Sequence, residues 1–315
     1  MTKKKFAAYK TKKRRIPPLL ISFLVLFAVF LAGLFRPDGF LRQTPSSLPD
    51  RELDSLTDPD EPLTVRFLDV GQGAAALLIS DSHAIVIDGG GRGTSSFFVA
   101  YLKEQGVTTL DAVIATHFDE DHIAGLIGAM NVFPANEVLV PAYTADTKIY
   151  ASFMRMAENK NLPRRTPSPG ETLTFGKAAI RFLGPSRFDH ERENDNSLAV
   201  LISGGGCRFL FTGDLETEGE TELLASGRSL RADVLAVGHH GSSTSTTEEL
   251  LSAVSPSYAV ISVGADNGYG HPSPEVLARL KKAGCEVLRT DISGTVVLTA
   301  CGGAVLQPFR EPSAP

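Results

Sequence analysis

The 315-residue chain has no tryptophan and only three cysteines. Cys207, Cys285 and Cys301 have a spacing that fits no zinc or redox motif, which excludes a thiolate-based site of either kind. Each lies beside a predicted strand, so we interpret all three as small buried hydrophobic residues. One disulfide with a leftover thiol is the alternative.

Negative charge outweighs positive charge beyond the first fifteen residues. The whole chain has a net charge of −5 and residues 1–15 carry +8, so the remainder carries −13. No stripe of Lys and Arg with interleaved aromatic residues crosses this acidic part, which argues against tight binding of a nucleic-acid polymer by charge. A basic head before an acidic body is typical of an N-terminal targeting or membrane segment.

The segment after the basic head contains no charge. Residues 16–35 are twenty predominantly apolar residues, enough for a helix that spans a hydrocarbon core of about 30 Å. We predict a single membrane anchor, with residues 1–15 cytoplasmic and the catalytic domain extracytoplasmic. A cleaved signal peptide, which would make the protein secreted, is the main alternative, although the run is long and lacks an A-x-A site. A buried core helix is the other alternative.

The rest of the chain divides at about residue 63. Residues 36–62 are rich in Pro, Asp and Ser and predict a flexible linker. Residues 63–310 alternate short apolar runs with helical patterns and are long enough for a proper core. Two runs of strands, each followed by helices, predict an α/β (α+β) domain with a four-layer αββα arrangement.

Polar side chains gather where the predicted strands end, and five of the seven histidines lie in these segments, all but His83 and His190. Ends of strands converge on one rim of a sheet, where functional sites are commonly built. The strand-end residues are Asp69, Asp88, His117, Asp214, His239, His240 and His271.

The stretch "ATHFDEDHIAG", residues 115–125, is the densest polar cluster. His117 and Asp119 lie in a loop, and Asp121 and His122 open the next predicted helix. Imidazole and carboxylate groups bind Zn²⁺, Mn²⁺ or Fe²⁺. With Asp214 and one of the adjacent histidines His239 and His240, the ligands suffice for two divalent ions. A solvated acidic helix cap with incidental histidines is the alternative.

These motifs together resemble a known family. "THFDEDHIAG" is similar to the H-x-H-x-D-H-x-G-G signature of the metallo-β-lactamase superfamily, with Asp119 in place of the second histidine. "FLDVGQG", "IDGG", "NDNSLAVLI", "FTGDLE", "VGHHGSSTS" and "YGHPSPEVL" follow in the order seen in the hydrolase domain of ComEC-type DNA-uptake (competence) proteins. We expect a free-standing relative of that domain on a single anchor, without the multi-span channel.

The resemblance implies a role for each ligand. His117 and Asp119 would hold the first metal. Asp121 and His122 would hold the second, and Asp214 would bridge the two ions. His240, chosen over His239, would complete the second site. The histidine that many members place before the bridging aspartate is absent, and Asn194, Asn196 and Ser197 stand there instead, which implies a looser first site. An acid frequent after "VGQG" is Ala74 here.

Catalytic roles follow from two metal ions that activate a water molecule and clamp phosphate oxygens. Asp121 would orient the nucleophile. His271 would protonate the leaving oxygen or bind a phosphate oxygen, with a structural histidine as the alternative. Asp69 and Asp88 would support metal-bound histidines or serve as turn residues. Further hydrogen-bond donors to a substrate phosphate would be Asn267, Tyr269, Ser242 and Ser243.

We therefore expect a membrane-anchored hydrolase with two divalent ions, Zn²⁺ or Mn²⁺, that cleaves phosphodiesters and acts as a nuclease on DNA. Hydrolysis of small or cell-surface phosphoesters, such as phosphorylcholine, is the alternative that the acidic charge favours. A non-catalytic metal-binding module is a third. The missing histidine argues against β-lactam hydrolysis, and the sequence indicates no particular protein partner.

Overall fold

The computed structural model describes residues 42–44 and 50–311, all within one compact unit that begins at Leu41. The basic segment 1–15 and the predicted anchor 16–35 lie outside the described residues and stay predictions. Within the described ranges, no helix combines the length and the apolar character needed to cross a membrane.

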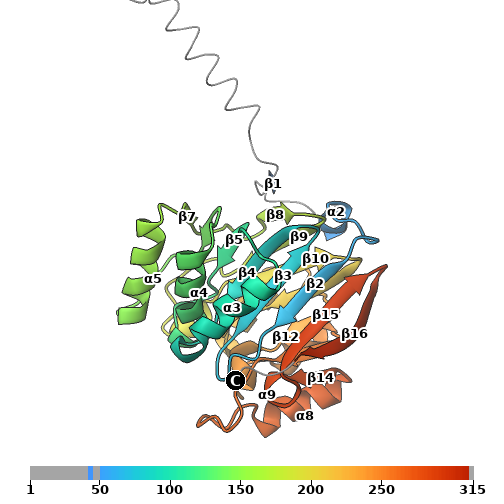
Figure 1. Cartoon of the computed structure of the whole chain (residues 1–315). Helices are drawn as coiled ribbons and strands as arrows, with labels where there is room; N and C mark the ends of the chain where they lie inside the picture. Colours follow the sequence, from blue (N-terminus) through green and yellow to red (C-terminus); the bar gives the residue numbers. More distant parts are fainter. Residues whose placement is uncertain (1–41, 45–49, 312–315) are drawn as a thin grey trace, which may run out of the picture. The chain divides into compact units, whose positions relative to one another are not determined.

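The described strands form two sheets of eight strands each (Figure 1). In the first sheet the order is β16 (Ala304–Glu311), β15 (Thr295–Cys301), β2 (Leu63–Phe67), β3 (Ala75–Ser80), β4 (His83–Asp88), β5 (Ala112–Ile114), β6 (Val138–Leu139) and β7 (Arg164–Arg165). In the second it is β1 (Arg42–Thr44), β8 (Thr172–Phe175), β9 (Ala178–Gly184), β10 (Ala199–Gly204), β11 (Cys207–Phe211), β12 (Val234–Ala236), β13 (Tyr258–Ile261) and β14 (Glu286–Arg289).

Helices cover the outer face of each sheet. The first sheet packs under α3 (Ser95–Glu104), α4 (Glu120–Val132) and α5 (Lys148–Asn159). The second packs under α6 (Thr217–Ala225), α7 (Glu248–Val254) and α8 (Pro274–Ala283). A third apolar cluster lies between the two sheets. These layers confirm the predicted αββα architecture.

Strand β4 shows why an inner strand is apolar on both faces. Ile85 and Ile87 point into the cluster between the sheets, whereas Ala84 and Val86 point into the cluster beneath the helices. Successive side chains of a strand alternate between its two faces, so a strand covered on both sides needs a continuous apolar run. The sequence "HAIVID" supplies such a run.

Part of the segment predicted as a flexible linker is folded. Strand β1 pairs antiparallel with β8, and α2 (Asp50–Ser55) packs Leu53 completely into the core of the second sheet. Asp54 binds Arg208 at 2.6 Å and accepts a hydrogen bond from Ser203. The Pro, Asp and Ser content did not indicate this short helix, which buries Leu53, while Leu56 just after its end packs against the same cluster. The folded domain therefore begins before residue 63.

Each sheet changes from antiparallel to parallel pairing along its order. Strands β4 to β7 pair in parallel in the first sheet, and β11 to β14 do so in the second. The carboxyl ends of parallel strands share one edge, and the loops that leave these ends lie close together. The predicted polar residues follow several of these strands.

Candidate metal centre

The loops after four strands supply the polar cluster. Asp88 is the last residue of β4, and His117 follows β5 by three residues. Asp121 and His122 lie in the first turn of α4. Asp214 follows β11, and the turn Gly238–Gly241 after β12 carries His239 and His240. Both of these histidines have a positive φ, 49° and 53°, a costly backbone conformation that is typical of functional sites.

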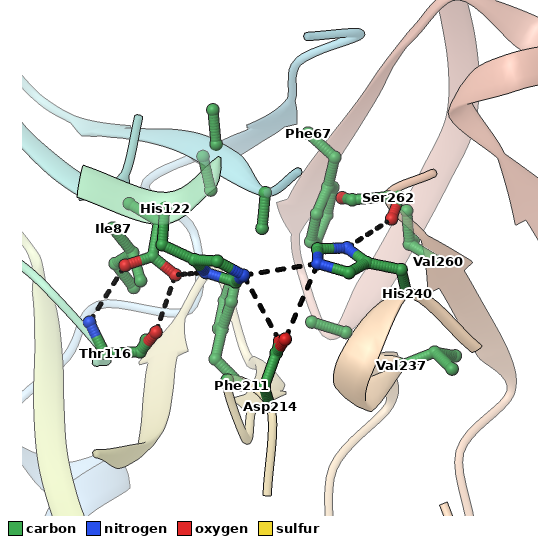
Figure 2. A pocket seen from close by; sticks show the side chains of 16 residues that line it. Phe67, Ile87, Thr116, His122, Phe211, Asp214, Val237, His240, Val260 and Ser262 are labelled. Carbon is green, nitrogen blue, oxygen red and sulfur yellow. Dashed lines mark hydrogen bonds and ion pairs between the residues drawn. The ribbon is translucent and has the colours of Figure 1, made fainter. Parts of the chain in front are cut away.

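Three side chains meet at the centre of the cluster (Figure 2). His122 Nε2 lies 3.3 Å from Asp214 Oδ1 and 3.2 Å from His240 Nε2. His240 Nε2 lies 3.2 Å from Asp121 Oδ2. Two groups of three ligand atoms are each contained within 4.8 Å: His117, His122 and Asp214, and Asp121, His122 and His240. His122 belongs to both groups, so the two candidate sites adjoin.

The cluster closes the end of the space between the sheets. Phe67 from the first sheet and Phe211 from the second stack with ring centroids 5.4 Å apart. Both rings line a small cavity together with His122, Asp214 and His240 (Figure 2). This apolar floor lowers the local dielectric constant and strengthens the electrostatic interactions of the cluster.

The donor set fits divalent cations. His117 is fully buried, and its Nε2 has no hydrogen-bond partner although it points at Asp214, 3.8 Å from Oδ2. A buried polar atom without a partner is costly unless something else satisfies it. Imidazole nitrogens facing carboxylates at these distances are what Zn²⁺, Mn²⁺ or Fe²⁺ require.

A second layer of side chains fixes the orientation of the histidines. Asp88 Oδ2 accepts from His122 Nδ1 at 2.8 Å, and the same carboxylate accepts from the Thr116 amide and hydroxyl. His240 Nδ1 lies 2.9 Å from the Ser262 carbonyl oxygen. His117 Nδ1 lies 3.1 Å from the Thr116 hydroxyl. With Nδ1 occupied, each ring presents Nε2 to the centre.

The charges in the cluster shift each other's pKa values. Burial opposes ionisation of Asp214, but His122, His240 and His117 outweigh it and hold its pKa well below the usual range. For Asp121, burial is likewise outweighed by the hydrogen bond from His240 and nearby positive charge, and the pKa falls to about 2. Burial lowers the pKa of His122, yet Asp214 and Asp88 raise it well above its ordinary value. The carboxylates are therefore ionised and ready to bind cations.

Asp119 and His239 lie at the edge of the cluster. Asp119 Oδ2 is 3.7 Å from His117 Nε2, and 46% of its side chain is exposed. The nearby His117 ring lowers the pKa of Asp119. His239 Nε2 is 3.9 Å from Asp214 Oδ2 and does not join either compact group, whereas His240 does. This placement favours His240 over His239 as a candidate ligand, and Asp119, like His239, joins neither compact group.

His271 lies on the rim. Its ring is 5.6 Å from that of His239 between centroids, and its Nδ1 is buried without a hydrogen-bond partner. Burial, followed by the positive charges of His239 and His240, lowers the pKa of His271. The structure thus brings His271 to the site but not into the ligand cluster.

Other candidate residues form hydrogen bonds with neighbouring protein groups. Asp69 accepts a hydrogen bond from the Gly71 amide. The side-chain amide of Asn267 forms hydrogen bonds with the backbone of its own loop. Ser242 contacts the Thr244 hydroxyl and amide. Ser197, which stands near the position of the missing histidine, accepts from the Asp214 amide.

Two residues near the cluster had no predicted role. Thr116 connects Asp88 with His117, and its only sequence signal is its position before His117. Glu216 Oε1 lies 3.7 Å from His239 Nδ1, and Glu216 also forms an ion pair with Arg192. Its signal was its place in "FTGDLE", two residues after Asp214. Asn194 Nδ2 lies 3.4 Å from His239 Nε2.

An αββα sandwich with histidines and carboxylates at the strand ends of one edge defines a class of metal-dependent hydrolases. Residues 68–265 match the family model described as "Metallo-beta-lactamase superfamily". The chain belongs to this superfamily.

Several curated proteins are similar to the chain at 31% identity. They are ComE operon protein 3 of Bacillus subtilis (74% of this chain, 32% of the relative), Competence protein ComA of Neisseria gonorrhoeae (86% and 36%) and Recombination protein 2 of Haemophilus influenzae (90% and 32%). The chain thus spans about a third of the length of these relatives. Among solved structures, the metallo-beta-lactamase fold protein YhfI from Bacillus subtilis is similar with a TM-score of 0.49 and 18% identity, over 78% of this chain and 99% of that one.

Proposed function

We propose that the chain is a phosphodiesterase that cleaves DNA with two divalent cations, Zn²⁺ or Mn²⁺, on the outer side of the cell membrane. The observation that carries the proposal is the pair of adjoining ligand groups that share His122. Two-cation sites are suited to phosphate esters because they contact both the attacking and the leaving oxygen. The names of the relatives, which refer to competence and recombination, support DNA as the substrate.

The cations would be held by His117, Asp119 and Asp214 on one side and by Asp121, His122, His240 and Asp214 on the other. When bound, they lower the pKa of a water molecule and neutralise phosphate charge. Asp121 stays ionised at every working pH because its pKa is about 2. Its carboxylate therefore accepts a hydrogen bond from the attacking water and orients it. His271 donates a hydrogen bond to the leaving oxygen from the rim.

Hydrolysis of small or cell-surface phosphoesters is the second candidate. The observation that favours it is the net charge of −13 over residues 16–315, which repels a long polyanion. Cleavage of DNA requires the bound cations to supply the positive potential at the site.

The test compares three substrates with the full chain in detergent and either metal. They are single-stranded DNA, bis-p-nitrophenyl phosphate and p-nitrophenylphosphorylcholine. We expect DNA cleavage that Asp121→Ala lowers by more than about 100-fold, the upper range for loss of a supporting residue alone. His83→Gln is the control, since His83 is bound to Asp111 away from the cluster. Turnover of small esters alone would favour the second candidate, and no turnover with either metal would contradict both.

The proposed location has its own test. A protease added to intact cells should degrade residues 63–310, because the anchor places them outside. Degradation only after the cells are lysed would contradict this location.

A further inference from the structure

Tyr269 stands out on the rim of the cluster because the residue is 73% exposed. Among the described residues it is the most exposed large hydrophobic side chain. Single exposed apolar residues are common and need no explanation by themselves. The position and the rigidity of Tyr269 set it apart.

The loop that carries Tyr269 is held in one conformation by Asn267. Asn267 Nδ2 donates to the carbonyl oxygens of Gly264 and His271, at 2.9 and 2.6 Å. Its Oδ1 accepts from the backbone amides of Tyr269 and His271, at 3.2 and 3.1 Å. The Gly264 amide donates to Gln72 Oε1 and ties the loop to the first sheet. The exposed ring is therefore presented by a fixed backbone.

A row of rings leads from Tyr269 to the cluster. The Tyr269 ring stacks on that of His271, with centroids 5.8 Å apart and an angle of 25° between the planes. The His271 ring contacts that of His239, and His239 Nε2 lies 3.9 Å from Asp214. Moving outward from the carboxylate of Asp214, a proposed cation ligand, the row passes through the two histidine rings and ends at the exposed ring of Tyr269. This is also the order of phosphate, sugar and base in a nucleotide.

We propose that Tyr269 is a stacking platform for an unpaired base next to the cleaved phosphate. The inference rests on the proposed phosphodiesterase function and narrows its substrate to single-stranded nucleic acid, because the bases of a duplex are covered by their neighbours. Stacking on an aromatic ring needs no positive charge and tolerates every base. It thus supplies an attraction for DNA that the acidic surface lacks.

The absence of tryptophan gives a direct readout of stacking. Tyr269→Trp introduces a single tryptophan at the platform. We expect single-stranded oligonucleotide to quench its fluorescence in stopped flow with Mn²⁺, before strands are cut. An oligonucleotide made only of abasic residues should not quench it. Leu306→Trp is the matched control, because Leu306 is also exposed, at 53%. Leu306 pairs with Thr299, which in turn pairs with Thr64 near the start of β2. Equal quenching at both positions, or by the abasic strand, would overturn the proposal.

Kinetics supply the second test. Tyr269→Ala should raise KM for the single-stranded oligonucleotide by roughly 10- to 100-fold with little change in kcat, and should leave KM for the abasic strand unchanged. Tyr269→Phe should retain the wild-type KM, because stacking needs the ring and not the hydroxyl. Equal losses with Ala and Phe would overturn the proposal by pointing to a hydrogen bond. If the wild-type chain cuts no DNA at all, the proposed function fails, while the fluorescence experiment still decides whether bases stack on this ring.

Discussion

At the scale of single residues, the cluster depends on which nitrogen each histidine turns inward. His122, His240 and His117 all have a partner at Nδ1, and their Nε2 atoms face the centre. Asp88 is central to the orientation of these rings, because its carboxylate accepts hydrogen bonds from both His122 and Thr116.

Asp88→Asn should weaken metal binding by about 10- to 100-fold, because an amide no longer fixes the His122 tautomer as the carboxylate does. Titration with Zn²⁺ or Mn²⁺ measures the effect. The control is Asp111→Asn, which alters a similar pair, with Asp111 Oδ1 3.0 Å from His83 Nδ1 and Asp111 Oδ2 bound to the Ala84 amide. Equal metal affinities in the two variants would show that Asp88 does not act through His122.

The residues that support the histidines, Asp88 and Thr116, were harder to predict than the candidate ligands themselves. The motif "THFDEDH" and the strand ends pointed to the residues that meet at the centre. The sequence left Asp88 open between a support for histidine and a turn residue, because its partner His122 is 34 positions away. Thr116 was missed for the same reason. The preference for His240 over His239 depended on the resemblance, since adjacent residues give no signal of which ring turns inward.

At the scale of elements, the start of α4 is clamped against the first sheet. The Gly89 amide donates to the His122 carbonyl oxygen at 2.7 Å, and the Ala74 amide donates to that of Asp121 at 3.1 Å. Gly125, one turn further on, lies so close to Gly89 that a Cβ added there would be 1.8 Å from the Gly89 carbonyl oxygen. The clamp sets the position of both ligands in the first turn.

Gly125→Ala should therefore push α4 away from the sheet. We expect unfolding free energy to fall by about 1–3 kcal/mol, typical of overpacking, with a parallel loss of metal affinity. Urea unfolding and metal titration measure the two effects. Gly93→Ala is the control, because a Cβ there meets nothing within 4 Å. Unchanged metal affinity in Gly125→Ala would mean that α4 does not position Asp121 and His122.

Glu220 connects α6 with the loop that follows the two adjacent histidines. It accepts hydrogen bonds from the Thr246 amide and from the amide and hydroxyl of Thr247. Burial outweighs these hydrogen bonds and raises the pKa of Glu220. A raised carboxyl pKa means that the folded state binds the proton more tightly. This contribution to stability is present below the unfolded pKa and is lost as pH rises through the folded pKa.

Glu220→Gln should destabilise the domain by about 1–3 kcal/mol, because an NH₂ group cannot accept the hydrogen bonds from Thr247 that the second oxygen of Glu220 accepts, protonated or ionised. The gap in unfolding free energy between wild type and variant should narrow from pH 4 to pH 7, since only the wild type loses stability as Glu220 ionises. Urea unfolding at several pH values measures it. A gap that widens over this range would show that the pKa is not raised in the fold.

Strand and helix patterns predicted most of the elements, because inner strands such as β4 need an unbroken apolar run. The segment before residue 63 was the exception. Its composition favoured disorder, but one buried leucine, Leu53, and the ion pair of Asp54 with Arg208 hold α2 on the domain. Neither contact is visible in a local pattern, because Arg208 lies 154 positions away.

At the scale of the whole molecule, the order of the strands in each sheet could not be predicted from the sequence. Strand β15 pairs with β2 although more than two hundred residues separate them, and Thr64 and Thr299 meet there at 3.2 Å. The overall layer arrangement was predictable because it depends only on which elements alternate. Net charge was also predictable, and it has a consequence for the substrate.

KM for DNA should fall as NaCl rises from about 20 to about 200 mM, because salt screens repulsion between DNA and the acidic domain. This is the reverse of a basic DNA-binding protein, in which salt weakens binding. KM for bis-p-nitrophenyl phosphate, which carries one charge, should change little. A steep rise in KM for DNA would reveal a basic binding groove that the charge distribution does not indicate.

Metal content tests the central claim most directly. Elemental analysis of the folded full chain, supplied in turn with Zn²⁺ and Mn²⁺ and then dialysed, should show close to two ions per chain for at least one metal. Asp214→Ala should lose most of this content, because Asp214 lies within 4 Å of His117, His122, His239 and His240. Folded wild-type protein that retains no ion of either metal would contradict the account.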